Sequence, residues 1–208
     1  MKMMTFYWWL GGVAAVAAIA AVGSRAFIFG MILFIACMMG AGVHAVMKTV
    51  VEERREQTLP FIMSLPITVR EYTSAKMIAN LVLFAAVWLT LSGASFVVFT
   101  GPEGMPAGAI PFVTIVLVGV FLAYTLVLAT SLVTESIGWS VASTVWANLG
   151  TQLFLWWVVD LHGIRTVIGG NVAVWNTTAL TVLGAQLAVI AALIGLTFGL
   201  QSRKTDFI

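Results

Sequence analysis

The chain is poor in charge and in cysteine. Only 9% of its 208 residues are Asp, Glu, Lys or Arg, against about 25% in a typical soluble domain, which excludes an ordinary soluble globular protein. The formal net charge is +2 and the basic residues are scattered, so the charge balance does not indicate a nucleic-acid partner. Cys37 is the single cysteine and lies in an apolar run, which excludes a disulfide framework and a pair of thiols for a metal or redox centre.

Sequence patterns for catalysis are also lacking. No Gly-rich loop of the form G-x-x-x-x-G-K-[ST] is present, so we do not expect the chain to hydrolyse ATP alone. The two histidines, His44 and His162, are far apart in the sequence and, with one cysteine, do not form a metal-ligand pattern. We therefore expect no enzyme activity, no catalytic residues, no metal site and no cofactor in this chain.

Long apolar stretches dominate the sequence instead. Hydrophobic residues make up 61% of it, and division at charges and Gly/Pro clusters leaves six stretches of about the 17 to 25 residues that a helix needs to cross a hydrocarbon core. The stretches are residues 6–22, 26–47, 77–99, 112–133, 139–159 and 179–200. We expect an all-α integral membrane protein with six transmembrane helices in a single transmembrane domain, residues 1–208. The first stretch is interpreted as a retained span, because the chain after it is just as hydrophobic.

The basic residues are unevenly divided between the two sides of these spans. Arg25 and Arg165 fall on one side, and the other side carries Lys2, Lys48, Arg54, Arg55, Arg70, Lys76, Arg203 and Lys204. By the positive-inside rule, both termini and the segment 48–76 are predicted to be cytoplasmic, in a cell membrane of the inner or plasma type. On the outer side, the connection 160–178 is apolar and broken by glycines, which favours short re-entrant or interfacial helices over the alternative of an ordinary surface loop.

A dense cluster of charge follows the second stretch. Five consecutive charged side chains, residues 52–56, precede an apolar patch at residues 59–65. Such a segment can lie along the membrane face with its apolar side in lipid and its charges turned to a soluble partner. Pro60 and Pro66 interrupt any long helix here, which predicts short helical pieces joined by turns. The alternative is a solvated loop that only satisfies the positive-inside rule.

Two further helix faces are unusual in composition. In the fifth stretch, polar side chains recur at steps of about four, a spacing that places them along one helix side; they are Ser140, Thr144, Asn148 and Gln152, with Thr151 beside them. Polar groups in hydrocarbon need a partner or water, so this stripe either packs against a helix or lines a pathway. In the second stretch, Ala36, Gly40 and His44 share a face suited to close helix contact, which makes it a candidate dimer seam.

Both the charged cluster and the residues after it form a recognisable string. It runs Glu52-Glu53-Arg54-Arg55-Glu56-Gln57-Thr58-Leu59, then Ser64-Leu65-Pro66-Ile67-Thr68, then Arg70-Glu71-Tyr72 and Ala75-Lys76. In order and spacing this string resembles the permease subunits of ABC-2-type ABC transporters, and the six-span layout extends the resemblance to nearly the whole chain. The string departs from the common pattern at Gln57, where glycine is usual, and at Pro60, where an acidic residue is frequent.

The resemblance implies an ABC-2-type exporter fold with a cytoplasmic coupling helix between the second and third spans. That helix docks in a groove of a separate ATP-binding subunit, which binds ATP and Mg²⁺. The coupling residues so implied are Glu52, Glu53, Arg54, Arg55, Glu56, Thr58, Leu59 and Pro66. Two ATP-binding subunits and a second permease, a copy or a homologue, complete the transporter, whose pathway forms largely from the second and fifth spans.

The substrate class follows from the resemblance only in outline. A lining of hydroxyl, amide and aromatic side chains suits amphiphilic or hydrophobic molecules, such as a lipid, a peptide, a drug or a glycan. Two alternatives remain open, a membrane assembly scaffold that transports nothing and an exporter of haem or another cofactor with the same general shape. An ion-coupled transporter is disfavoured, because none of the six stretches has a charged residue near its centre.

Overall fold

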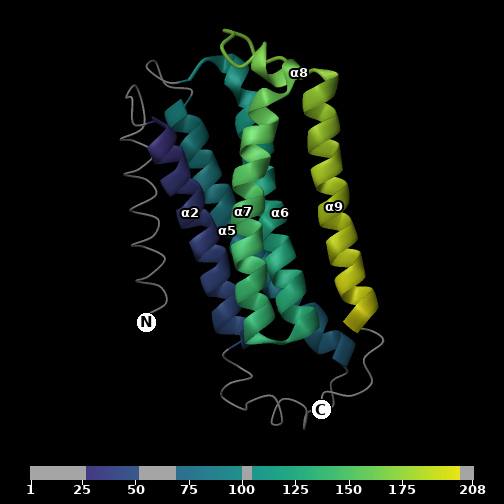
Figure 1. Cartoon of the computed structure of the whole chain (residues 1–208). Coiled ribbons are helices and arrows are strands. Elements are labelled where there is room, and N and C mark those ends of the chain that lie inside the picture. The colour runs from purple at the N-terminus through teal and green to yellow at the C-terminus, as the bar shows by residue number, and fades with distance from the viewer. Residues whose placement is uncertain (1–26, 52–68, 100–104, 202–208) are drawn as a thin grey trace.

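The computed structural model describes residues 27–51, 69–99 and 105–201, and every regular element in these ranges is a helix. In chain order the elements are α2 (Phe27–Val46), the π-helix η1 (Met47–Val51), α5 (Val69–Phe99), the 3-10 helix η2 (Ala107–Ala109), α6 (Ile110–Thr134), α7 (Ile137–Asp160), α8 (His162–Arg165) and α9 (Thr177–Gln201). The long helices run alongside one another as a bundle, and α8 lies at the end of the bundle where α7 and α9 are joined (Figure 1). The expected all-helical architecture is confirmed for this part of the chain.

Within the described residues, three helices are long and apolar enough to cross a membrane. They cover Glu71–Val97, Ala107–Thr134 and Thr177–Gln201, and they correspond to the expected spans at residues 77–99, 112–133 and 179–200. Helices α2 and α7 match two more of the expected stretches in position, whereas the stretch at residues 6–22 lies outside the described residues. The helices thus fit a membrane protein, and the six-span layout stays a prediction.

Helix α6 forms the centre of the bundle. Helices α2, α5, α7 and α9 all pack on it, whereas α7 and α9 make very little contact with each other. In its most apolar part 72% of the residues are buried, against 22% in α5 and 17% in α9. The sequence of Ile110–Thr134 has no charged residue, which permits burial on every side. Because α9 has none either, the packing of four helices on α6, and not its composition alone, sets this position.

The turn between α6 and α7 is short. Glu135 has a φ of 54°, in the left-handed region, and its N–H donates to the carbonyl oxygen of Ser131 at 3.0 Å, which closes the end of α6. Only Glu135 and Ser136 separate Thr134 from Ile137. This tight connection makes α6 and α7 antiparallel neighbours.

At the other end of the bundle, the connection between α7 and α9 folds back on the start of α6. The N–H of Gly108 donates to the carbonyl oxygen of Gly170 at 2.7 Å, and a Cβ atom at Gly108 would lie 2.0 Å from the carbonyl oxygen of Val167, so only glycine fits. Asn176 accepts from the N–H of Ala179 at 2.9 Å and so caps α9. Ile164 of α8 is 1% exposed. The connection therefore contains a packed short helix, as expected.

Candidate functional site

We call residues 52–68 the charged segment. The structure describes the residues directly before and after this segment. The residues expected to couple to an ATP-binding subunit lie outside the described residues; they are Glu52, Glu53, Arg54, Arg55, Glu56, Thr58, Leu59 and Pro66. The π-helix η1 ends directly before the segment, and α5 begins at Val69, directly after it and upstream of the expected span start at residue 77. The last part of the string, residues 70–76, thus lies on the first turns of α5. Short π-helical segments are rare and often mark functional positions.

Polar side chains join these two flanks to the centre of the bundle. The hydroxyl of Thr49 in η1 shares its proton between the carbonyl oxygen of Ala45, at 2.7 Å, and Oδ1 of Asn80 in α5, at 2.8 Å. The hydroxyl of Tyr124 in α6 donates to the carbonyl oxygen of Asn80 at 2.9 Å. Asn80 is 2% exposed and Tyr124 is 1% exposed. Hydrogen bonds of buried groups hold their geometry well, because breaking them leaves unpaired polar atoms. We call Thr49, Asn80 and Tyr124 the inner network.

Aromatic packing surrounds the inner network. The rings of Phe84 and Tyr124 are stacked, with centroids 3.7 Å apart, and the indole N–H of Trp88 donates to the carbonyl oxygen of Leu117 at 2.8 Å. A Cβ atom at Gly42 of α2 would lie 2.5 Å from the ring of Tyr124, so glycine is needed for α2 to approach this closely. Helices α2, α5 and α6 are therefore tightly fitted around the inner network.

The five expected pathway residues all lie on α7. They occupy positions that range from buried to half-buried. Ser140 and Thr151 are buried, whereas Thr144, Asn148 and Gln152 are only half-buried. Steps of four residues rotate by about 40° each on a helix of 3.6 residues per turn, so the stripe drifts away from α6. Burial places Ser140 and Thr151 in the packing of the described bundle. The pathway role of the stripe stays a prediction.

The polar groups of this stripe bond within α7. The hydroxyl of Ser140 donates to the carbonyl oxygen of Ser136 at 2.9 Å, and that of Thr151 to the carbonyl oxygen of Ala147 at 2.7 Å. The amide of Asn148 likewise donates to the carbonyl oxygen of Thr144 at 2.9 Å. Such bonds to the preceding turn satisfy the side chain without linking it to a neighbouring helix.

The candidate dimer seam lies on α2. Ala36 is exposed, and Gly40 and His44 are half-buried. Among the described residues, no atom lies within 4 Å of the position that a Cβ atom of Gly40 would take, so these residues leave the α2 face open at Gly40. Its contact with a second copy stays a prediction.

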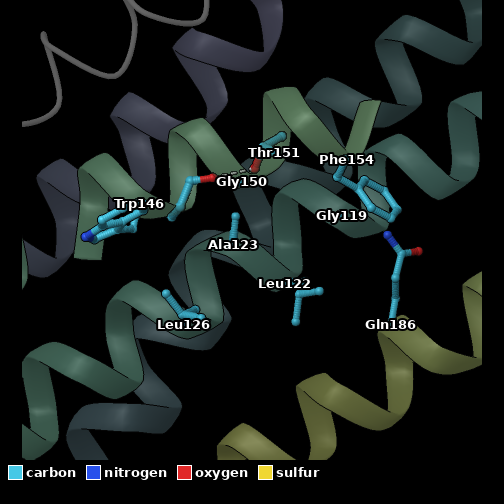
Figure 2. A pocket seen from close by; sticks show the side chains of 10 residues that line it. Gly119, Leu122, Ala123, Leu126, Trp146, Gly150, Thr151, Phe154 and Gln186 are labelled. Carbon is cyan, nitrogen blue, oxygen red and sulfur yellow. Dashed lines mark hydrogen bonds between the residues drawn. The ribbon is translucent and has the colours of Figure 1, made fainter. Parts of the chain in front are cut away.

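A groove of about 310 Å³ lies between α6, α7 and α9. Its lining combines small, aliphatic and aromatic side chains: Gly119, Leu122, Ala123 and Leu126 from α6, Trp146, Ala147, Gly150, Thr151 and Phe154 from α7, and Gln186 from α9. Figure 2 shows Gln186 reaching from α9 toward Gly119 and Phe154. Sequence reasoning singled out only Thr151 among these residues. The sequence offered one signal for the groove. Gln186 is an amide in the middle of an apolar stretch, where a polar side chain is costly and often functional.

Gln186 is the one residue of α9 in this lining, and it is 4% exposed. Its Nε2 donates to the carbonyl oxygen of Ile115 in α6 at 3.0 Å, whereas its Oε1 is buried without a hydrogen-bond partner among the described residues. A Cβ atom at Gly119 would lie 3.1 Å from Nε2 of Gln186. Glycine at position 119 therefore lets the amide of α9 reach the backbone of α6.

The described residues offer little acid, base or metal chemistry. In residues 27–51, 69–99 and 105–201, no group of three or more His, Cys, Asp and Glu side chains comes together that could hold a metal ion. His162 is exposed at the start of α8, and the neighbouring Trp156 and Trp157 are exposed on α7. The geometry favours binding through shape, apolar contact and a few hydrogen bonds. Comparison of the chain with protein-family models, with curated proteins and with solved structures gives no match.

Proposed function

We propose that this chain is the permease subunit of an ABC-2-type ABC transporter. With a second permease and two separate ATP-binding subunits it forms a pathway for ATP-driven export of an amphiphilic or hydrophobic substrate. In this arrangement the chain crosses the inner or plasma membrane six times, and both termini are cytoplasmic. ATP is hydrolysed by the partner subunits, because this chain has no nucleotide-binding loop.

The observation that carries the proposal is the string of residues 52–76, which resembles the coupling region of this family. The charges at residues 52–56 give the segment a hydrated surface for a soluble partner, and the apolar patch that follows suits the membrane face. Without such a partner, the only role of five adjacent charges in an otherwise apolar chain would be to fix the side of the membrane on which this segment lies.

The flanks of the segment support the same proposal. The inner network joins η1, at the end before the segment, to α5, at the end after it, and both to α6. A displacement of the segment by an ATP-binding subunit would therefore move α2 and α5 together, because buried hydrogen bonds and close aromatic packing resist separation of these helices. That is the mechanical property that a coupling segment needs.

The first test removes one acid and one base from the charged segment. The tagged full chain is expressed in its native host and purified in mild detergent, and Mg²⁺-dependent ATP hydrolysis of the purified sample is measured. We expect wild-type protein to carry ATPase activity, and the Glu53→Ala/Arg54→Ala variant to lose about tenfold of it, which corresponds to about 1.4 kcal/mol of docking free energy. Mass spectrometry of the same samples follows the amount of the ATP-binding subunit.

A matched control variant also leaves the net charge unchanged, but its two substitutions lie in another part of the chain. Lys204→Ala/Asp206→Ala also removes one base and one acid, outside the string, and should leave the copurified ATPase activity unchanged. Wild-type protein that purifies without any ATP-binding subunit would refute the proposal. Equal ATPase activity in the Glu53→Ala/Arg54→Ala variant and the wild type would remove the coupling role of the segment.

A further inference from the structure

The groove between α6, α7 and α9 lies halfway along its helices. On α6 (Ile110–Thr134) its lining runs from Gly119 to Leu126, and on α7 (Ile137–Asp160) from Trp146 to Phe154. Helices α6 and α9 are both long and apolar enough to cross a membrane. A site at the midpoint of spanning helices lies at the level of the hydrocarbon core, where water is scarce and the surrounding medium consists of lipid chains.

The groove also opens to the side of the bundle. Trp146 and Leu126, on its two walls, are 71% and 36% exposed, and α7 and α9 scarcely touch across it. Molecules in the surrounding bilayer can therefore enter without separation of packed helices. We infer that the groove binds one acyl chain of a bilayer phospholipid.

The polar groups in the lining are already satisfied or out of reach. The hydroxyl of Thr151 donates to the carbonyl oxygen of Ala147 at 2.7 Å (Figure 2). Nε2 of Gln186 donates to Ile115, and its Oε1 is fully buried in the protein. Apart from the indole N–H of Trp146, the surface that remains is hydrocarbon, from Leu122, Ala123 and their neighbours. A polar headgroup or a glycan would lose hydrogen bonds to water here without replacement, whereas a methylene chain gains close apolar contacts.

The length of the groove suits a lipid chain. The lining from Gly119 to Leu126 rises by about 10 Å at 1.5 Å per residue. A single extended chain is slender enough, and it can lie along the small residues at positions 119, 123, 147 and 150.

Photolabelling with a lipid tests this inference. The purified full chain is placed in nanodiscs that contain a phosphatidylcholine with a diazirine halfway along one acyl chain, and labelled residues are mapped by mass spectrometry after irradiation. We expect labels to concentrate on residues 119–126 of α6 and 146–154 of α7. In the Gly150→Leu variant, labelling of these residues should fall by about tenfold, equivalent to about 1.4 kcal/mol of lost binding.

Two further variants serve as controls for Gly150→Leu. No atom lies within 4 Å of a Cβ position at Gly150 or at Gly184 of α9, but only Gly150 lines the groove. Gly184→Leu therefore adds the same side chain at a similar depth and should leave the labelling unchanged. Gly150→Ala fills less of the groove and should give an intermediate decrease, which is informative even where Gly150→Leu folds poorly.

Three results would overturn the inference. They are labels spread evenly over all exposed helix faces, equal labelling of wild type and Gly150→Leu, and no labelling of the groove in wild type because a second copy or a cargo molecule covers it. The inference requires that α6 and α9 cross the membrane and does not depend on an ATP-binding partner. Its failure would leave the transporter proposal intact, and loss of that proposal would leave the lipid site intact.

Discussion

Helix α6 has two sides that are built differently. Toward α2 and α5, side chains of one helix reach the backbone of the next, as Tyr124 does at Asn80 and Trp88 at Leu117. Toward α7, the hydroxyls bond within their own helix, and the groove remains between α7 and α9. We call these the closed side and the open side. Bonds between helices are not confined to the closed side, because Gln186 and Gln201 of α9 donate to carbonyl oxygens of α6. What distinguishes the open side is that the hydroxyls of α7 bond to their own helix and leave a groove beside them.

Glycine has opposite meanings on the two sides. On the closed side, a Cβ atom at Gly42 would lie 2.5 Å from Tyr124 and 2.9 Å from Phe84, so glycine permits close helix contact. On the open side, nothing lies within 4 Å of a Cβ position at Gly150. Glycine there leaves space instead. The two sides lie at the same level of α6, because Tyr124 falls between Gly119 and Leu126, the ends of the groove lining on this helix.

The largest effect is expected from opening the closed side at Tyr124. Tyr124→Ala removes a fully buried ring that stacks on Phe84, and the cavity left by a large aromatic side chain costs about 3 to 5 kcal/mol of unfolding free energy. Tyr124→Phe keeps the ring and loses the hydrogen bond to Asn80, at a cost of about 0.5 to 1.5 kcal/mol. Denaturant titration in detergent measures both. Equal losses in the two variants would show that ring packing does not hold this side together.

The sequence predicts the helices of the bundle well. Helices α6, α7 and α9 each extend only one or two residues beyond the predicted stretches 112–133, 139–159 and 179–200, because Gly, Pro and charge clusters interrupt both apolarity and helix there. The start of α5 is different. Division at charges makes the predicted stretch begin at residue 77, but Arg70, Glu71 and Lys76 are good helix formers, so the helix begins earlier, at Val69.

The arrangement of the helix faces is much harder to predict. A helix that is apolar all round, such as α6, has no stripe that shows which neighbour it meets. The groove arises because small residues from α6 and α7 meet beside Gln186, which comes from a third helix. Spacing alone placed the stripe of α7 on a single helix face, whereas its drift of about 40° per step of four divides it between buried and half-buried positions.

A smaller effect is expected from adding one methyl group to each side. Gly42→Ala on the closed side forces Tyr124 and Phe84 to move, and overpacking of this kind costs about 1 to 3 kcal/mol. Gly150→Ala on the open side meets no atom and should not lower the unfolding free energy, since alanine is the better helix former by about 1 kcal/mol. Parallel unfolding titrations compare the two. The contrast between the sides would be lost if both variants were destabilised equally.

The smallest effect is expected at the link between α9 and α6. Gln186→Met keeps the length of the side chain and loses the bond from Nε2 to Ile115, but it also removes the unpartnered buried Oε1. A lost hydrogen bond and a relieved unpaired group each amount to about 1 kcal/mol, so the unfolding free energy should change by less than about 1 kcal/mol. Gln186→Glu has the same shape but buries a charge, and should cost several kcal/mol at neutral pH. A loss of unfolding free energy in Gln186→Met as large as in Tyr124→Ala would contradict this expectation. It would mean that the amide of Gln186 holds α9 on α6, so that a side-chain bond to a neighbouring backbone would stabilise the open side as it does the closed side.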